Sequence, residues 1–262
     1  MMQSLTTAAT GMVAQQYNLD TISNNLANVN TTGFKRQRAE FEDLTYQTFQ
    51  VSGTSNSSTA VQPTSVQIGL GSNLAASASS FGIGPMQSTG NALDLAINGD
   101  GFFMVKRADG TTAYTRDGNF QTDSAGNIVT NNGDKIDPPI LIPPGSTAVN
   151  ISADGTVSGI LVGSTEPQVI GQIKIAMVPN PGGLTRAGQN LFTASAGSGE
   201  PTPVTPGESG SGPLQSSYLE GSNVQVVDEM VRMIMAQRAY EINSKAIQTA
   251  DQMLSIVNGL AR

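Results

Sequence analysis

The fold is decided at the C-terminal end, where residues 226–257 read VVDEMVRMIMAQRAYEINSKAIQTADQMLSIV. Apolar residues recur there at every seventh position, with further apolar residues between them. Seven-residue spacing places a narrow apolar stripe along one side of a helix, and such a helix requires a partner helix. The repeating residues are Val226, Met233, Tyr240, Ile247 and Leu254, with Met230, Ala250 and Val257 between them.

The N-terminal end carries the same pattern over residues 5–29. Two sets of apolar residues form it: Leu5, Met12, Leu19 and Leu26 at seven-residue spacing, and Ala8, Ile22 and Val29, each offset by three. The residues between the two ends do not repeat the pattern. A helical stripe at each end predicts termini that pair as a coiled coil, in assemblies of the chain with copies of itself.

The bounds of both helices can be read from their flanking residues. We expect the first helix over residues 4–29, because Gly33 follows a short Asn/Thr segment as a stop signal. The last helix is predicted to begin with a capping box, in which Ser222 is the N-cap and Gln225 stands three residues on. It should end near Asn258.

The N-terminal helix has poor intrinsic propensity. Gln15 stands at a stripe position where an apolar residue is expected. Asparagine side chains compete for backbone hydrogen bonds in non-helical conformations, and this segment has four of them. They are Asn18, Asn24, Asn25 and Asn28. The helix is therefore predicted to depend on its C-terminal partner.

Composition excludes several chemistries. The chain has 262 residues, enough for one large domain or two small ones, and it has no Cys, His or Trp. Disulfides, thiolate nucleophiles, Cys/His zinc sites and imidazole acid–base catalysis are thereby excluded. Carboxylate catalysis and oxygen-ligated metals are not excluded.

Charge and hydropathy exclude further partners. The net charge is −7 and only 13% of residues are charged, whereas a nucleic-acid-binding protein needs basic density. No apolar run reaches the roughly 18 residues of a membrane-spanning helix, so no membrane insertion is expected. The first residues, MMQSLTTAATGMVAQQ, lack the basic and apolar regions of a secretory signal peptide.

The middle of the chain is predicted to be an all-β domain over residues 91–193. Apolar residues alternate with others over 93–97 and 173–177, the period of strands with one buried face. Three Asp-Gly pairs are hairpin signals between β-prone runs. They are Asp109-Gly110, Asp117-Gly118 and Asp154-Gly155.

Extended connecting segments, residues 34–90 and 194–219, are expected between this β domain and a terminal coiled-coil domain formed by 1–33 and 220–262. Residues 34–50 are interpreted as a short continuation anchored by Phe41, Leu44 and Phe49, and 52–80 as an irregular extended stretch or long hairpin. Residues 194–217 are rich in Pro, Gly and Ser, typical of a linker or surface excursion. The predicted fold class is α+β.

No motif marks a catalytic, cofactor-binding or metal site. The Gly-rich run Asn98–Phe103 lacks the Lys-Ser/Thr of a phosphate loop, which favours a tight turn. Asp117, Asn119 and Asp123 lack the bidentate Glu and spacing of a calcium loop. Nothing marks a catalytic pair among the 20 Asp and Glu residues. We expect no enzyme activity and no cofactor.

Two clusters of side chains remain to be interpreted. The first is more typical of salt bridges, within the chain or between packed subunits, than of a ligand site. Its members are Lys35, Arg36, Arg38, Glu40, Glu42 and Asp43. The second, Met230, Met233 and Met235, could form an adaptable binding surface, but on a heptad stripe it favours the core of an assembled interface.

Two long terminal segments resemble the flagellar rod and hook axial protein family. They are ISNNLANVNTTGFKRQRAEFEDLTYQTF, residues 22–49, and EGSNVQVVDEMVRMIMAQRAYEINSKAIQTADQMLSIVNGL, residues 220–260. The central runs NGDGFFMV and AYTRDGNFQTDSAGNIVT are also similar to that family. Within it, FKRQRAEFEDLTYQTF and QRAYEINSKAIQTADQML favour the distal rod branch, with the proximal rod and hook subunits as alternatives.

The resemblance implies a structural subunit that polymerises into a tubular shaft. That shaft would cross the periplasm within the flagellar basal body and transmit motor torque to the hook. The implied partners are copies of the chain in a helical homopolymer, the proximal rod, the hook and the surrounding ring proteins. It also implies terminal helices lining the inner wall, the β domain outside, and export without a cleaved signal peptide.

A second class of function stays open from the residues alone. A soluble β-domain enzyme or binding module could carry the helices as a coiled-coil oligomerisation handle. A polar pocket within residues 91–193 would favour this class. Growth of the chain into tubes would favour the filament subunit.

Overall fold

The computed structural model describes residues 2–50, 55–57, 60–61, 64–161 and 167–260. They form two compact units. The helical unit comprises the described parts of residues 1–26, 37–78 and 225–262, and the β unit comprises 27–36 and the described parts of 79–224. The β unit thus includes residues 27–36, 79–90 and 194–224, for which the sequence predicts a place in the terminal domain or in connecting segments.

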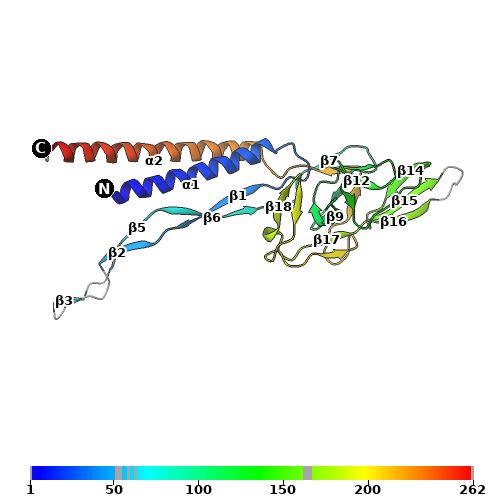
Figure 1. Ribbon diagram of the computed structural model, residues 1–262, viewed down its shortest axis with the longest axis horizontal. Helices are drawn as coiled ribbons and strands as arrows, with labels where there is room; N and C mark the ends of the chain where they lie inside the picture. The colour runs from blue at the N-terminus through cyan, green and yellow to red at the C-terminus, as the bar shows by residue number, and fades with distance from the viewer. Residues whose placement is uncertain (1, 51–54, 58–59, 62–63, 162–166, 261–262) are drawn as a thin grey trace. The chain divides into compact units, whose positions relative to one another are not determined.

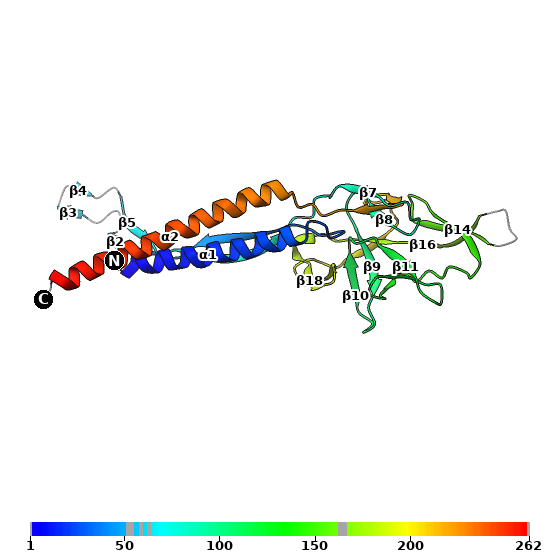
Figure 2. The ribbon, with the colours of Figure 1, turned by 90° about the horizontal axis from the view of Figure 1, so that it is seen from above.

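Two long helices of the helical unit run antiparallel (Figures 1 and 2). They are α1 (Met2–Ala27) and α2 (Val226–Leu260). A Cβ atom on Gly11 would lie 2.9 Å from Asn243 Nδ2, and Asn25 Nδ2 donates to Glu229 Oε2 over 3.1 Å. From the first contact to the second, the chain advances along α1 from Gly11 to Asn25 and goes back by the same number of residues along α2, from Asn243 to Glu229. With the strands described below, they confirm the α+β class. Over its described residues, neither helix has the apolar length that a membrane span requires.

The predicted cap of α2 is wrong. The helix begins three residues later than the capping box requires, and Glu229 N–H donates to Gln225 O over 3.0 Å at its start. Ser222 Oγ instead accepts the N–H of Val224 over 3.3 Å. Residues up to 224 belong to the β unit, so tertiary hydrogen bonds override the local signal. At the far end α2 continues through Gly259.

The described parts of residues 37–79 form a long hairpin, whereas the sequence predicts a hairpin or an irregular extended stretch only over 52–80, and residues 34–50 do not continue α1. β1 pairs with β6, and β2 and β3 pair antiparallel with β5 and β4. Residues 51–54, 58–59 and 62–63 of the predicted stretch lie outside the described residues. The strands are β1 (Gln37–Asp43), β2 (Tyr46–Gln50), β3 (Ser55–Ser57), β4 (Ala60–Val61), β5 (Val66–Gly69) and β6 (Ser72–Ser79).

The β unit is built from short strands around one main sheet. In the described residues this sheet has nine strands, ordered β11-β12-β13-β9-β10-β19-β18, with β17 joining β9 to β20. A second sheet has the order β14-β15-β16. The first strands are β7 (Met86–Ser88), β8 (Leu95–Ile97), β9 (Phe102–Lys106), β10 (Thr112–Thr115), β11 (Phe120–Thr122), β12 (Ile128–Thr130) and β13 (Lys135–Ile136). The others are β14 (Ser146–Ile151), β15 (Thr156–Leu161), β16 (Gln168–Gln172), β17 (Ile175–Met177), β18 (Thr185–Gly188), β19 (Leu191–Thr193), β20 (Thr202–Val204), β21 (Leu214–Ser216) and β22 (Tyr218–Glu220). A 3-10 turn occupies Pro181–Gly183.

The core lies on both faces of β9. Phe103 and Val105 belong to the larger apolar cluster, while Phe102 and Met104 belong to a smaller one. Successive strand residues point to opposite faces, so β9 is buried on both sides. β8 is also wholly buried, which corrects the expectation of one buried face over residues 93–97.

Two of the three predicted Asp-Gly hairpins are present. Asp109-Gly110 lies between β9 and β10, and Asp154-Gly155 lies between β14 and β15, each between paired antiparallel strands. The third prediction is wrong, because β10 and β11 are not neighbours. Gly118 instead allows its backbone to lie close to that of Leu95, since a Cβ atom there would lie 1.6 Å from Leu95 O.

Residues 194–219 do not behave as a free linker. Three short strands lie between 202 and 220 and pair with strands far away in sequence, β17, β8 and β7. Leu214 and Leu219 are buried and anchor this segment. These buried residues are few and widely spaced within a Pro/Gly/Ser-rich segment, so the composition does not predict them.

Candidate functional site

The strap, residues 28–36, follows α1 and is held inside the β unit. Gly33 N–H donates to Glu220 O over 2.8 Å, and Thr32 Oγ1 donates to Asp117 Oδ1 over 2.9 Å. Phe34 and Lys35 are buried. The strap is thus part of the β unit although it begins directly after α1.

Three buried charges meet where the strap crosses the β unit. We call Lys35, Arg116 and Glu220 the Glu220 cluster. Lys35 Nζ lies 2.6 Å from Glu220 Oε1, and Arg116 Nη1 lies 3.2 Å from Oε2. All three side chains are almost fully buried. Charged side chains are seldom buried so completely unless they are paired.

Backbone groups supply further hydrogen bonds to the cluster. Glu220 Oε1 also accepts Gly84 N–H over 2.9 Å, Lys35 Nζ donates to Gly82 O over 2.8 Å, and Arg116 Nη2 donates to Gly99 O over 2.8 Å. Burial lowers the pKa of Lys35 and of Arg116, and the Glu220 carboxylate opposes both shifts. The cluster therefore depends on Glu220 to keep two cations stable away from water.

Arg186 holds the strap from a second side. Its guanidinium lies 5.1 Å from the Phe34 ring centroid and 5.3 Å from that of Phe192. It also donates to the backbone oxygen of Lys35. Cation–π contacts of a partly desolvated arginine add attraction beyond apolar burial.

In the helical unit, polar side chains occupy buried positions between α1 and α2. Asn25 Oδ1 accepts Gln37 N–H over 2.9 Å, and its Nδ2 donates to Gln37 O and to Glu229 Oε2. Glu229 has only 1% of its surface exposed. These bonds tie α1, α2 and the start of β1 together at one end of the unit.

The predicted seam residues are distributed unequally between buried and exposed positions. Ile22 and Ala250 are buried, and most of the others are partly buried. Val29 lies in the strap. The partly buried residues are Leu5, Ala8, Met12, Leu19, Leu26, Val29, Met233, Ile247 and Leu254. The exposed ones are Val226, Met230, Tyr240 and Val257. Their role as an assembly seam remains a prediction.

The beginning of α2 exposes large apolar side chains over about half of its circumference. Six of them lie within residues 226–235, interrupted by few charges. A contiguous exposed apolar face of this kind is typical of an interaction surface. The exposed residues are Val226, Val227, Met230, Val231, Ile234 and Met235.

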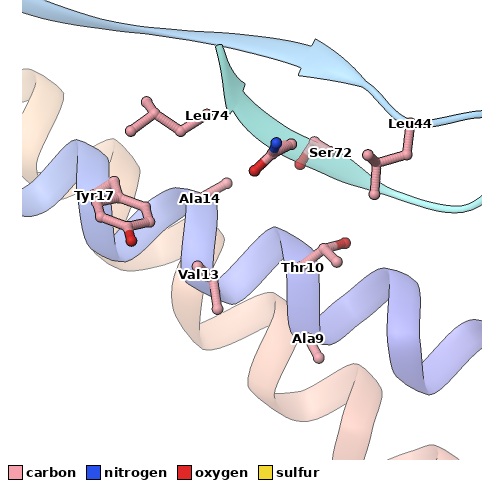
Figure 3. A pocket seen from close by; sticks show the side chains of 9 residues that line it. Ala9, Thr10, Val13, Ala14, Tyr17, Leu44, Ser72 and Leu74 are labelled. Carbon is pink, nitrogen blue, oxygen red and sulfur yellow. The ribbon is translucent and has the colours of Figure 1, made fainter. Parts of the chain in front are cut away.

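A groove of about 250 Å³ lies between α1 and the hairpin. Figure 3 shows Tyr17, Val13 and Ala14 of α1 on one side, with Leu44 and Leu74 of the hairpin on the other. Its lining has no charged residue. The groove adds a second apolar surface to the helical unit.

The predicted charge run is divided by the structure. Lys35 belongs to the buried Glu220 cluster within the chain, whereas Arg38 pairs with Glu40 at the surface. The Arg36 backbone N–H donates to Asn223 Oδ1 over 2.7 Å. Glu42 and Asp43 are exposed. Pairing between subunits remains a prediction for the exposed members.

Acidic side chains of the β unit mainly stabilise turns. A surface depression of about 350 Å³ is lined by Asp109, Asp134 and Arg107. The Asp109 carboxylate accepts the hydroxyl and N–H of Thr111, and these bonds lower its pKa. No group of three or more metal-ligating His, Cys, Asp or Glu side chains occurs in the part of the chain that the structure describes.

Sequence reasoning does not identify the residues that hold α1 against α2 or the strap within the β unit. Glu229, Ala236 and Asn243 share the seven-residue spacing of Ala250, so the pattern could have revealed them if small and polar residues had been counted. Arg116, Arg186 and Glu220 carry no such signal, because their partners are distant in sequence.

The fold and these open apolar surfaces define an α+β structural subunit with antiparallel terminal helices. Three family models match the chain: "Flagella basal body rod protein" over residues 5–35, "Flagellar hook protein FlgE/F/G D1 domain" over 96–159, and "Flagellar basal body rod FlgEFG protein C-terminal" over 215–260.

Full-length relatives agree with the family models. The flagellar basal-body rod protein FlgG of Borreliella burgdorferi is 52% identical over 100% of both chains. Proteins of the same name are 49% identical in Caulobacter vibrioides, over 99% of both chains, and 42% identical in Bacillus subtilis, over 100% of both. The chain belongs to the flagellar basal-body rod protein family, whose members are structural components and not enzymes.

Proposed function

We propose that this chain is a subunit of the distal rod, a helical homopolymer that forms a tubular drive shaft and transmits torque from motor to hook. The relatives described above support the proposal, since each is named a flagellar basal-body rod protein and is matched over nearly its whole length. The proximal rod, the hook and the surrounding ring proteins are the further partners.

The observation that carries the proposal is the apolar surface of α2. A single copy leaves Val227, Ile234 and Met235 more than half exposed. Burying each such side chain is worth about 1.5–3 kcal/mol, so neighbouring copies would gain strongly by covering this surface. The charge-free groove beside Tyr17 offers a second surface of the same kind.

In the proposed shaft the terminal helices pair as a coiled coil and line the inner wall, while the β unit faces outward. The shaft crosses the periplasm. Its subunits leave the cell through the flagellar export channel without a cleaved signal peptide. An acidic chain with few charges is compatible with close packing of many copies, because self-repulsion remains small.

Electron microscopy of the purified chain over a concentration series tests this function. We expect tubes above a threshold concentration, and a threshold at least tenfold higher for Ile234→Asp, because the carboxylate would be desolvated between copies. Gln237→Asp, also exposed on α2, is the matched control and should shift the threshold far less. A wild-type chain that stays monomeric, or Ile234→Asp tubes at the normal threshold, would contradict the proposal.

A further inference from the structure

The Glu220 cluster joins the segment that follows α1 to the segment that precedes α2. The strap follows α1 directly, and only residues 221–225 separate Glu220 from α2. Inside the β unit, Gly33 N–H donates to Glu220 O, and Arg36 N–H donates to Asn223 Oδ1 over 2.7 Å. The two chain segments that lead to the helices are therefore hydrogen-bonded to each other.

The strap brings one charge to a pair that the rest of the β unit already holds. Arg116 and Gly84 N–H contact the Glu220 carboxylate independently of the strap. Lys35 is the third member and adds the second cation. If the strap were released, a balanced Arg116–Glu220 pair would remain, so the β unit can keep its own charge balance without the strap.

Close backbone packing at Gly33 also holds the strap. Gly33 has φ +65°, and a Cβ atom there would lie 2.6 Å from both Arg116 C and Asp117 N. Only glycine combines this left-handed conformation with such a close backbone approach. Among the contacts that hold the strap, the steric one at Gly33 and the electrostatic one at Lys35 can each be changed separately.

We propose that Lys35, Gly33 and Glu220 are positioning residues that tether α1 and α2 to neighbouring points of the β unit in the free subunit. Short tethers raise the effective concentration of one helix for the other before any neighbour arrives. The inference concerns the free subunit. It rests on the proposed function only in assuming that the paired helices later take part in assembly.

The size of the effect follows from chain length. With the chain held at Gly33 and at Glu220, the connection from Gly11 to Asn243 is about 45 residues, and release of the strap up to residue 79 roughly doubles it. Loop-closure probability falls as the power 3/2 of length, so the effective concentration should fall about threefold.

Paired cysteines measure this effective concentration. The chain has no Cys, so Gly11→Cys with Asn243→Cys introduces the only thiols, at a point where α1 and α2 touch. The rate of disulfide formation is measured in dilute monomer and compared in Lys35→Met and Gly33→Ala backgrounds. Arg38→Met, which removes a surface pair three residues from Lys35, is the matched control. Glu220 itself is left unchanged, because its loss would bury two cations without a counter-charge.

Amide exchange of the same monomers gives a second readout. Lys35→Met and Gly33→Ala should each slow the disulfide about threefold and speed exchange of residues 33–36 at least tenfold, with β9 and β10 unchanged. Arg38→Met should change neither. Unchanged strap exchange and disulfide rates in both variants would overturn the proposal, as would an equal effect of Arg38→Met. General loss of protection in β9 and β10 would also overturn it, since the strap would then stabilise the whole unit. These readouts need no assembly, so they can fail independently of the proposed function.

Discussion

Replacement of Ile22 by Asp is expected to abolish assembly while the β unit stays folded. Ile22 is only 3% exposed, at a predicted seam position of α1. An unpaired carboxylate at such a position costs several kcal/mol. Leu19→Pro should act in the same direction, because proline removes a helical hydrogen bond and clashes with the preceding turn, at about 3 kcal/mol or more.

The measurement compares sedimentation and electron microscopy of the variants with thermal unfolding of their β unit. Ser23→Asp is the matched control, since Ser23 neighbours Ile22 but is exposed. It should assemble normally. Normal rods formed by Ile22→Asp or by Leu19→Pro would show that the terminal seam does not hold subunits together.

Phe103→Ala should have the largest effect on the β unit. Phe103 is fully buried in β9 and meets Phe120 edge to face, with ring centroids 5.2 Å apart. Truncation of such a residue leaves a cavity and costs about 3–5 kcal/mol. Urea unfolding followed by circular dichroism should show a much lower midpoint.

Val169→Ala is the control for this substitution. Val169 is 67% exposed on β16, so its truncation should change the unfolding free energy by less than about 0.5 kcal/mol. A midpoint for Phe103→Ala close to that of Val169→Ala would contradict the placement of the core around β9.

The features readable from the sequence were those with local periodicity. The seven-residue pattern located both helices to within a few residues, because helical apolar spacing depends only on near neighbours. Asp109-Gly110 and Asp154-Gly155 were read correctly for the same reason. The pattern did not reveal which side of α2 is covered, since apolar residues extend over about half of the circumference of its first turns.

The features that could not be read depend on distant partners. Glu220 meets Lys35 and Arg116 only after the β unit has folded. Likewise, strand pairing of residues 202–220 with β17, β8 and β7 is invisible in a Pro/Gly/Ser-rich composition. The failed cap at Ser222 shows the same cause, because tertiary bonds outweighed a local signal.

The contact between α1 and α2 explains why the helical unit should need neighbours. Gly11 meets Asn243, Asn25 bonds to Glu229 and Ile22 is buried, whereas large apolar side chains at the start of α2 remain exposed. Ordering each residue costs about 1–2 kcal/mol of backbone entropy. One such contact between two helices offsets little of this cost, so ordering of the helices should be coupled to assembly.

Amide exchange of the free subunit and of the assembled rod tests this coupling most directly. In the monomer, amides of residues 2–26 and 226–260 should exchange fast, while those of the strap and of the β9 and β10 strands stay protected. In the rod, both helices should become protected as well. A monomer whose terminal helices are as protected as β9 and β10 would contradict the account.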